Sequence, residues 1–208
     1  MRPTGHQLRS LGGVAGPVAF VSAWSILGAT KAGYSPVHDP ISRLAAVDSA
    51  SRVAMTGGFL AFSLGVGLYA RELKASMPGG AAVAALTTAV ATVGIAVTPL
   101  GSPLGGVGHA TCAGMAYSGL AALPIVGGRY LARQGRQRAS TSSIAVGVAS
   151  GACLLASVLS PDGVGLLQRT GLTLGDIWIV ITAVGMARQA ASPGGDADSR
   201  RRLAAADR

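Results

Sequence analysis

Long apolar stretches, each free of lysine and arginine, alternate along the chain with polar connections. A transmembrane helix needs roughly 17–25 apolar residues, and the stretches that come close to this length are 11–30, 53–70, 79–100, 110–128, 143–159 and 172–187. They are apolar on all sides, whereas a surface helix of a soluble protein has a charged face. They also lack the alternation of barrel strands. The pattern predicts an all-α bundle of six transmembrane helices within residues 1–190 and a disordered tail over 191–208.

The first apolar stretch has a basic start, as a secretory signal peptide does. Its apolar run of about 20 residues is longer than the usual 7–15-residue core of such a peptide. The run ends in Leu27-Gly28-Ala29, where the large leucine does not fit the small-residue pattern of a cleavage site. We therefore expect this stretch to remain as the first helix.

Composition supports a membrane protein, because half of the 208 residues are hydrophobic and 12% are charged. Soluble domains carry about 25% charged residues. The net charge of +9 does not indicate a nucleic-acid partner, because thirteen of the 17 basic residues fall on one side of the predicted topology. The positive-inside rule assigns that side, and with it both termini, to the cytoplasm. Two lysines against fifteen arginines suggest a bacterial genome, so the predicted location is a bacterial plasma membrane.

The connection between the fourth and fifth stretches is the most basic one within the bundle. Its arginines are predicted to contact anionic lipid headgroups, at about 1 kcal/mol per basic residue near the surface; they are Arg129, Arg133, Arg136 and Arg138. Membrane lipids are therefore the predicted partners. The sequence leaves the oligomeric state open.

The first outer connection, 31–52, is the longest, and it carries a helix-start signal. Asp39 before Pro40 suits an N-cap followed by the first helical position, and a short helix is expected to begin there. Asp39, Ser42 and Arg43 then share one face of the turn. One interpretation is an exposed Asp39–Arg43 pair. The other directs His38, Asp39 and Ser42 into a polar pocket between the helix ends.

Further polar residues fall on the same predicted outer side. His109 begins the fourth stretch, Gln168 and Arg169 precede the sixth, and Asp176 follows within it. An acid inside a span is a functional-site hypothesis by default. Its expected partner is Arg169 or a protonated His109, and the alternative is a structural hydrogen bond near the interface. The candidate outer cluster comprises His38, Asp39, Ser42, His109, Gln168, Arg169 and Asp176.

Three chemistries could use this cluster. A metal hydrolase needs three or four ligands, for which zinc would be held by His38, His109 and Asp39, although no H-E-x-x-H is present. A serine hydrolase would need Ser42 near His109, but the chain has no G-x-S-x-G elbow. A transporter would depend on Asp176, the one acid available within a span.

The residues that carry the clearest resemblance are Tyr34-Ser35-Pro36, Asp39-Pro40-Ile41-Ser42, His109, and Gly165-Leu166-Leu167-Gln168-Arg169. With them the chain resembles the bacterial and archaeal family of six-helix membrane proteins called "domain of unknown function nine-nine-eight", from Leu11 to Arg188. The resemblance implies shared polar positions at Asp39, Ser42, His109, Gln168 and Arg169. One departure is that Leu100 and Gly101 follow Pro99, where relatives often have an acid. This departure weakens a catalytic interpretation, and the resemblance implies no activity.

The leading functional prediction is a non-enzymatic integral membrane protein with an outward polar pocket for a lipid headgroup or a partner. In this prediction Arg169 binds an anionic group, while Asp39, Ser42 and His109 position it by hydrogen bonds. No cofactor is expected. The alternative is a membrane-embedded, metal-dependent lipid hydrolase that acts at the outer leaflet.

Overall fold

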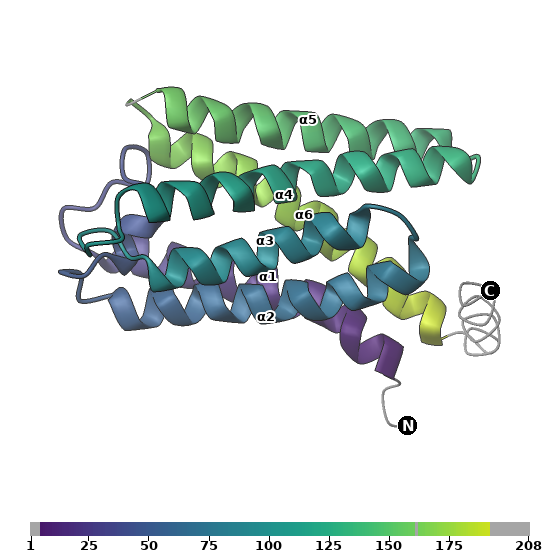
Figure 1. Cartoon of the computed structure of the whole chain (residues 1–208), viewed down its shortest axis with the longest axis horizontal. Helices are drawn as coiled ribbons and strands as arrows, with labels where there is room; N and C mark the ends of the chain where they lie inside the picture. Colours follow the sequence, from purple (N-terminus) through teal and green to yellow (C-terminus); the bar gives the residue numbers. More distant parts are fainter. Residues whose placement is uncertain (1–4, 161, 192–208) are drawn as a thin grey trace.

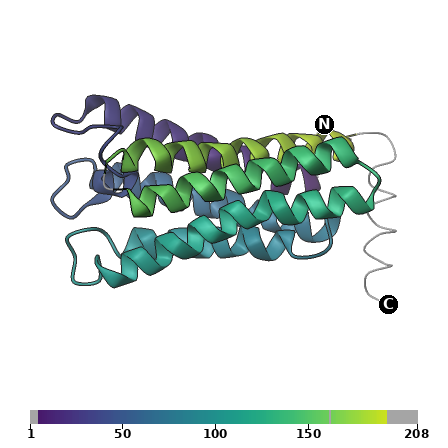
Figure 2. The ribbon, with the colours of Figure 1, turned by 90° about the horizontal axis from the view of Figure 1, so that it is seen from above.

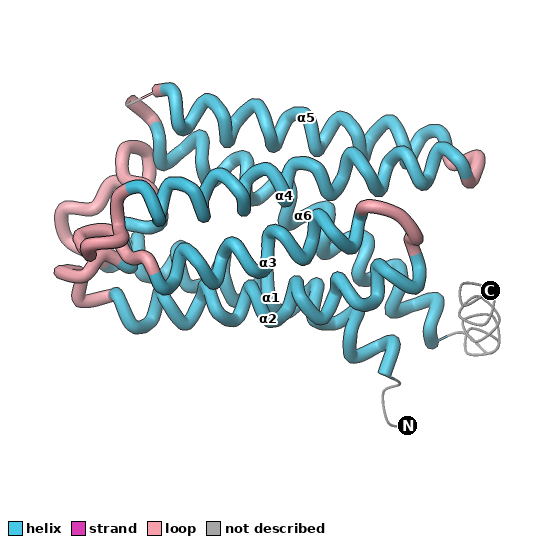
Figure 3. Tube along the Cα trace, in the orientation of Figure 1, coloured by secondary structure: helices cyan, strands magenta, loops and turns pink. Residues whose placement is uncertain are grey.

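The computed structural model describes residues 5–160 and 162–191, and no strand occurs among them. The helical class predicted from the sequence is confirmed (Figures 1 and 3). The elements in chain order are α1 (Gly5–Thr30), the short 3-10 helix η1 (Ile41–Ala45), α2 (Arg52–Ser76), α3 (Ala81–Val97), α4 (Val107–Arg133), α5 (Gln137–Leu159) and α6 (Val164–Ala191).

Five of the helices are long and apolar enough to cross a membrane, and α3 is a shorter apolar helix of 17 residues. At about 1.5 Å per residue α3 is roughly 25 Å long, slightly less than a hydrocarbon core of about 30 Å. The predicted third stretch, 79–100, was longer than this helix. Gly79 has a positive φ of 125°, and Thr98 ends the helix just before Pro99, because a proline disfavours the helical conformation in the residue before it.

The other helices extend beyond the predicted stretches. For example, α2 continues to Ser76, and α6 already begins at Val164. Hydropathy identifies the part of a helix that suits lipid, whereas the hydrogen-bonded turns continue into polar sequence. The predicted tail, 191–208, lies outside the described residues except for Ala191, which ends α6.

Consecutive helices pack against each other, and α1 packs against α6, which closes the bundle. In Figures 1 and 2 the α1–α2, α3–α4 and α5–α6 connections gather at one end, which we call the loop end. The α2–α3 and α4–α5 connections lie at the opposite end, together with the start of α1 and the end of α6. We call this the basic end, because it carries Arg129, Arg133, Arg136 and Arg138.

Close helix approach depends on glycines at several crossings. A Cβ on Gly65 of α2 would lie 2.5 Å from the carbonyl oxygen of Gly12 in α1, and Gly16 would also be in contact. Small residues at such crossings allow dispersion contacts between backbones where lipid removes the hydrophobic drive. The α1–α2 crossing therefore brings the two backbones into direct contact in the first half of α1, toward the basic end.

Candidate functional site

Arg169 of α6 is buried at the loop end and fastens the α1–α2 connection. Its Nη1 donates to the carbonyl oxygens of Pro36 at 2.8 Å, of Asp39 at 3.0 Å and of Gly165 at 3.0 Å. Its Nη2 donates to the hydroxyl of Tyr34. The guanidinium therefore joins the connection to the first turn of α6 through four acceptors.

Aromatic rings complete the surroundings of this cation. The guanidinium carbon lies 5.3 Å from the ring centre of Trp24 and 5.5 Å from that of Tyr34, within the range of cation–π attraction. Burial raises the pKa of the Tyr34 phenol, although the nearby Arg169 acts in the opposite direction. The charge of Arg169 is thus balanced by carbonyl dipoles and aromatic faces, and no carboxylate among the described residues pairs with it.

Gly165 provides the space that this arrangement requires. A Cβ at this position would lie 2.5 Å from the carbonyl oxygen of Pro36 and 2.8 Å from Nη1 of Arg169. In addition, the backbone N–H of Leu166 donates to the carbonyl oxygen of Val37 at 3.0 Å. The glycine of the Gly165-to-Arg169 motif therefore has a steric role in seating the connection on α6.

Gln168 fastens the next part of the same connection. Its Oε1 accepts a hydrogen bond from the backbone N–H of Ile41 at 2.7 Å, and its Nε2 donates to the hydroxyl of Tyr117 in α4. The side chain is buried, and it links η1, α4 and α6. Neighbouring residues on α6 therefore hold both halves of the first connection.

His109 lies near the start of α4 and is buried. Its Nδ1 is 2.8 Å from the carbonyl oxygen of Thr98. A carbonyl oxygen can only accept, so Nδ1 carries the hydrogen, and Nε2 of the neutral ring is an acceptor. Among the described residues Nε2 has no hydrogen-bond partner. The bond to Thr98 therefore fixes the ring and leaves one nitrogen available.

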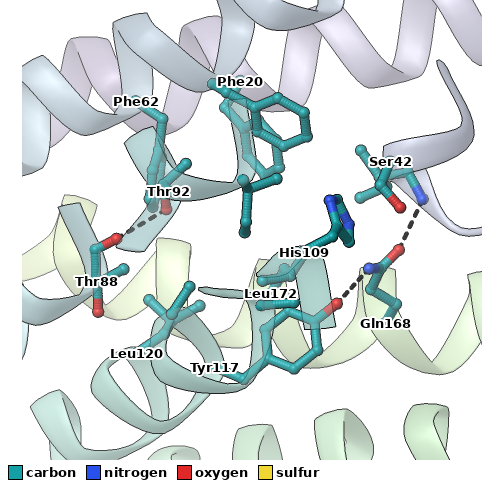
Figure 4. A pocket seen from close by; sticks show the side chains of 15 residues that line it. Phe20, Ser42, Phe62, Thr88, Thr92, His109, Tyr117, Leu120, Gln168 and Leu172 are labelled. Carbon is teal, nitrogen blue, oxygen red and sulfur yellow. Dashed lines mark hydrogen bonds between the residues drawn. The ribbon is translucent and has the colours of Figure 1, made fainter. Parts of the chain in front are cut away.

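A small cavity of about 40 Å³ lies inside the bundle beneath η1. Figure 4 shows His109, Ser42, Tyr117 and Gln168 near one part of it, with Phe20 and Phe62 opposite. Thr88 and Thr92 also line the cavity, but their hydroxyls donate to carbonyl oxygens of α3 itself. Within the described chain the hydroxyl of Ser42 has no hydrogen-bond partner. The polar groups with unused hydrogen-bonding capacity at this lining include Nε2 of His109, Oγ of Ser42 and the hydroxyl of Tyr117, which accepts from Gln168 and keeps its own hydrogen.

Two other residues of the predicted outer cluster, His38 and Asp39, lie away from the cavity. His38 is exposed, and its backbone N–H lies 3.3 Å from Oγ of Ser35. The carboxylate of Asp39 accepts from the backbone N–H of Ser35 at 2.8 Å and lies 3.3 Å from Nη1 of Arg43. The predicted Asp39–Arg43 pair is therefore present, and neither His38 nor the Asp39 carboxylate lines the cavity.

The predicted N-cap at Asp39 was wrong. The short helix is a 3-10 helix that begins at Ile41, Pro40 occupies the N-cap position, and no side chain caps it. The reason is that the Asp39 carboxylate already accepts the backbone N–H of Ser35, four residues earlier. The backbone N–H of Ile41 is instead satisfied by Gln168, which is distant in sequence.

The expected partners of Asp176 were also wrong. Both of its carboxyl oxygens are buried without a hydrogen-bond partner in the described part of the chain, so neither Arg169 nor His109 pairs with it. Asp176 lies seven residues beyond Arg169, about 10 Å along the helix at 1.5 Å per residue. That is two turns, which places the carboxyl near the middle of α6 rather than close to the interface.

The ligand set of the zinc alternative does not assemble. Across residues 5–160 and 162–191, no group of three or more His, Cys, Asp or Glu side chains could hold a metal ion. His38 is exposed on the connection, whereas His109 is buried in the cavity wall. The cavity does bring Ser42 and His109 to one lining, as the serine-hydrolase interpretation required, but no hydrogen bond joins the two side chains.

An ionic cluster at the basic end was not predicted from the sequence. The carboxylate of Glu72 in α2 is buried, 3.1 Å from Nδ1 of His6 and 3.9 Å from Nε of Arg9. The hydroxyl of Ser76 donates to it at 2.9 Å. Glu72 lies beyond the predicted second stretch, 53–70, so the apolar pattern did not indicate that its carboxylate is buried. The signal that was available is the basic pair His6 and Arg9, three residues apart at the start of α1.

Comparison with known proteins gives one match. The model of a family described as "Protein of unknown function (DUF998)" matches residues 14–185. The chain belongs to this family. No curated protein and no solved structure matches it.

The DUF998 match covers the whole loop-end site, including Arg169, Gln168, His109 and Ser42. It begins within α1, so His6 and Arg9, which contact Glu72, precede the matched residues. The resemblance inferred from the sequence motifs is thus confirmed. The chain is a helical membrane protein of a family whose function is unknown.

Proposed function

We propose that this DUF998 chain is a non-enzymatic membrane protein whose loop-end cavity binds the hydroxyl end of a lipid headgroup. The observation that carries the proposal is the 2.8 Å contact between Nδ1 of His109 and the carbonyl oxygen of Thr98. It presents Nε2 as a fixed acceptor, and Oγ of Ser42 can donate or accept at the same cavity. A hydroxyl, which also donates and accepts, matches this pair.

The size of the cavity limits the ligand to a small group. At about 40 Å³ it exceeds the roughly 10–15 Å³ that a cavity needs to hold one water molecule, but it is far smaller than the pockets of about 300–1,000 Å³ that enclose complete organic ligands. A hydroxymethyl group is of this order, whereas a complete phosphate headgroup is not. The aromatic wall formed by Phe20, Phe59 and Phe62 suits the carbon of such a group.

The contacts of Arg169 give it a positioning role in this proposal. Its Nη atoms are occupied by three carbonyl oxygens and the Tyr34 hydroxyl, and it does not line the cavity. The anion-binding role predicted for it from the sequence therefore has no support in the geometry. Arg169 and Gln168 instead hold the connection that carries Ser42 over the cavity.

The test is retention of 1-monooleoylglycerol by the detergent-purified full chain, measured by native mass spectrometry. Phosphatidylcholine, whose headgroup has no hydroxyl, is the comparison lipid. His109→Asn retains a donor near the position of Nδ1 and removes the Nε2 acceptor. We expect this variant and Ser42→Ala to bind monooleoylglycerol roughly 5-fold more weakly, the effect of about one net hydrogen bond.

The matched control is His38→Asn, which changes an exposed histidine on the same connection and should leave retention unchanged. Thermal unfolding of each variant shows whether the fold persists. Equal retention of both lipids, or equal retention in wild type and His109→Asn, would contradict the proposal and would leave the cavity as a site for ordered water.

A further inference from the structure

A larger cleft, of about 640 Å³, lies at the basic end of the bundle. It runs between the α4–α5 hairpin and the second half of α6, with the end of α2 at its edge. Its apolar wall includes Tyr130, Trp178, Ile181 and Met186, and its polar border includes Arg136 and Gln189. Its volume is typical of pockets for organic ligands, about 300–1,000 Å³. The cleft is separate from the loop-end cavity and shares no lining residue with it.

The wall of the cleft is built around a fixed indole. Nε1 of Trp178 donates to Oγ of Ser143 in α5 at 2.9 Å, and this hydrogen bond is buried. On α4, a Cβ on Gly127 would lie 2.5 Å from Cζ2 of the same ring. The ring is therefore held by a hydrogen bond on one helix and accommodated by a glycine on another, so this part of the cleft is formed before any ligand enters.

The cleft faces two environments at once. Ile177 and Ile181, both in its lining, are 51% and 65% exposed, and such apolar surfaces on a transmembrane helix meet lipid chains. Arg136 and Gln134, at the other border, are exposed and polar. An occupant must therefore have an apolar part toward the bilayer and a polar part at the basic end.

The arginines of the α4–α5 hairpin have no acidic partner among the described residues. Arg129, Arg133, Arg136 and Arg138 are all exposed and make no ion pair with the described residues. Of the described acids, Glu72 alone lies at this end, and its carboxylate is engaged by His6, Arg9 and Ser76. An anionic group near Arg136 would thus meet this cation without a competing carboxylate from the described residues.

We propose that the cleft binds one anionic phospholipid from the leaflet at the basic end. An acyl chain lies against Trp178 and Ile181, and the phosphate lies at Arg136. Charge complementarity selects an anionic lipid over a zwitterionic one, and the exposed isoleucines give the chain a lateral path from the bilayer. This inference does not rest on the proposed function, because a different end of the bundle and different residues carry it.

The test uses Trp178 as a local reporter. In a Trp24→Phe background Trp178 is the single tryptophan, and phosphatidylglycerol with brominated acyl chains quenches it when a chain enters the cleft. We expect saturable quenching by this lipid and much weaker quenching by brominated phosphatidylcholine. Arg136→Gln should raise the half-saturating concentration of phosphatidylglycerol about 5-fold, the effect of one basic residue.

A second variant blocks the cleft without disturbing its walls. Gly185 lines the cleft, and a Cβ added there would meet no atom within 4 Å, so Gly185→Leu should fill the space and remove saturable quenching. The matched controls are Arg129→Gln at the same end and Gly57→Leu on α2, where an added Cβ also meets no atom within 4 Å. Neither of these residues lines the cleft.

The outcomes separate as follows. Quenching that is lost in Gly185→Leu, weakened in Arg136→Gln and retained in both controls supports the site. Equal quenching by the two lipids, or equal weakening by Arg129→Gln and Arg136→Gln, would overturn it in favour of unspecific lipid contact. Native mass spectrometry of the same variants with Trp24 intact, using unbrominated phosphatidylglycerol, gives a second measurement if Trp24→Phe unfolds the chain.

Discussion

The loop end and the basic end of this bundle both depend on arginine, but they use it in opposite ways. Arg169 at the loop end is 7% exposed and is surrounded by carbonyl oxygens and aromatic rings. Arg136 at the basic end is exposed and borders a cleft of about 640 Å³. The same side chain therefore fastens the backbone in one place and is available to a ligand in the other, and burial decides which role it has.

The loop-end cavity and the basic-end cleft follow the same division. The loop-end cavity is small, and several of the polar groups around it already have hydrogen-bond partners, so we expect any ligand there to be selected by size and hydrogen bonding. The basic-end cleft is large and amphipathic, so we expect any ligand there to be selected by charge. We therefore expect substitutions of the buried residues at the loop end to lower the free energy of unfolding more than substitutions of the exposed arginines at the basic end.

The largest effect is expected for Arg169→Met. It removes hydrogen bonds to three backbone carbonyls and one phenol, one of them buried and three partly buried. Hydrogen bonds to charged groups contribute about 1.5–3 kcal/mol each. Water can replace part of those at the three partly buried acceptors, so we expect the free energy of unfolding to fall by about 4 kcal/mol. Thermal unfolding in detergent measures this loss, and proteolysis of the 31–51 connection provides a second readout.

Arg169→Lys is the informative companion to that substitution. Lysine keeps a positive charge and three donors, but it lacks the planar guanidinium that reaches several acceptors. The free energy of unfolding should therefore fall less in Arg169→Lys than in Arg169→Met. Substitutions that leave buried hydrogen-bonding groups without a partner normally lower the free energy of unfolding by more than about 1 kcal/mol. A smaller decrease in Arg169→Met would contradict the fastening role of Arg169 and would remove the contrast between the two ends.

A smaller loss is expected for Gly165→Ala. The added Cβ would lie 2.5 Å from the carbonyl oxygen of Pro36, so the connection must shift, at a cost of about 1–3 kcal/mol. Gly114→Ala is the control, because a Cβ there meets no atom within 4 Å and the change should add helix propensity. Unfolding temperatures that rise equally in both variants would show that the connection does not rest on Gly165.

The smallest effect on stability is expected for Arg133→Gln at the basic end. The side chain is exposed and makes no hydrogen bond or ion pair with the described residues, so the free energy of unfolding should change by less than about 0.5 kcal/mol. The measurement is the same thermal unfolding in detergent. A loss comparable to that of Arg169→Met would mean that the basic end is also structural.

Much of the loop-end site could be predicted from the sequence. Gln168, Arg169, His109 and Ser42 were expected at the same end because each borders a stretch whose direction follows from the alternation of helices. Their partners could not be predicted, because Arg169 and Pro36 are 133 positions apart and Gln168 and Ile41 are 127 apart. No local pattern encodes contacts over such separations.

The sequence by itself determined that the chain folds as apolar helices, because a membrane-spanning segment must satisfy its backbone within itself and so leaves a readable run of apolar residues. It also determined the basic end through the clustering of arginines. Only the tertiary structure decided what each charge does: Arg169 fastens a connection, Glu72 meets His6, and Asp176 is buried without a described partner. The reason is that burial and hydrogen-bond partners come from helices that are distant in sequence and meet only in the packed bundle.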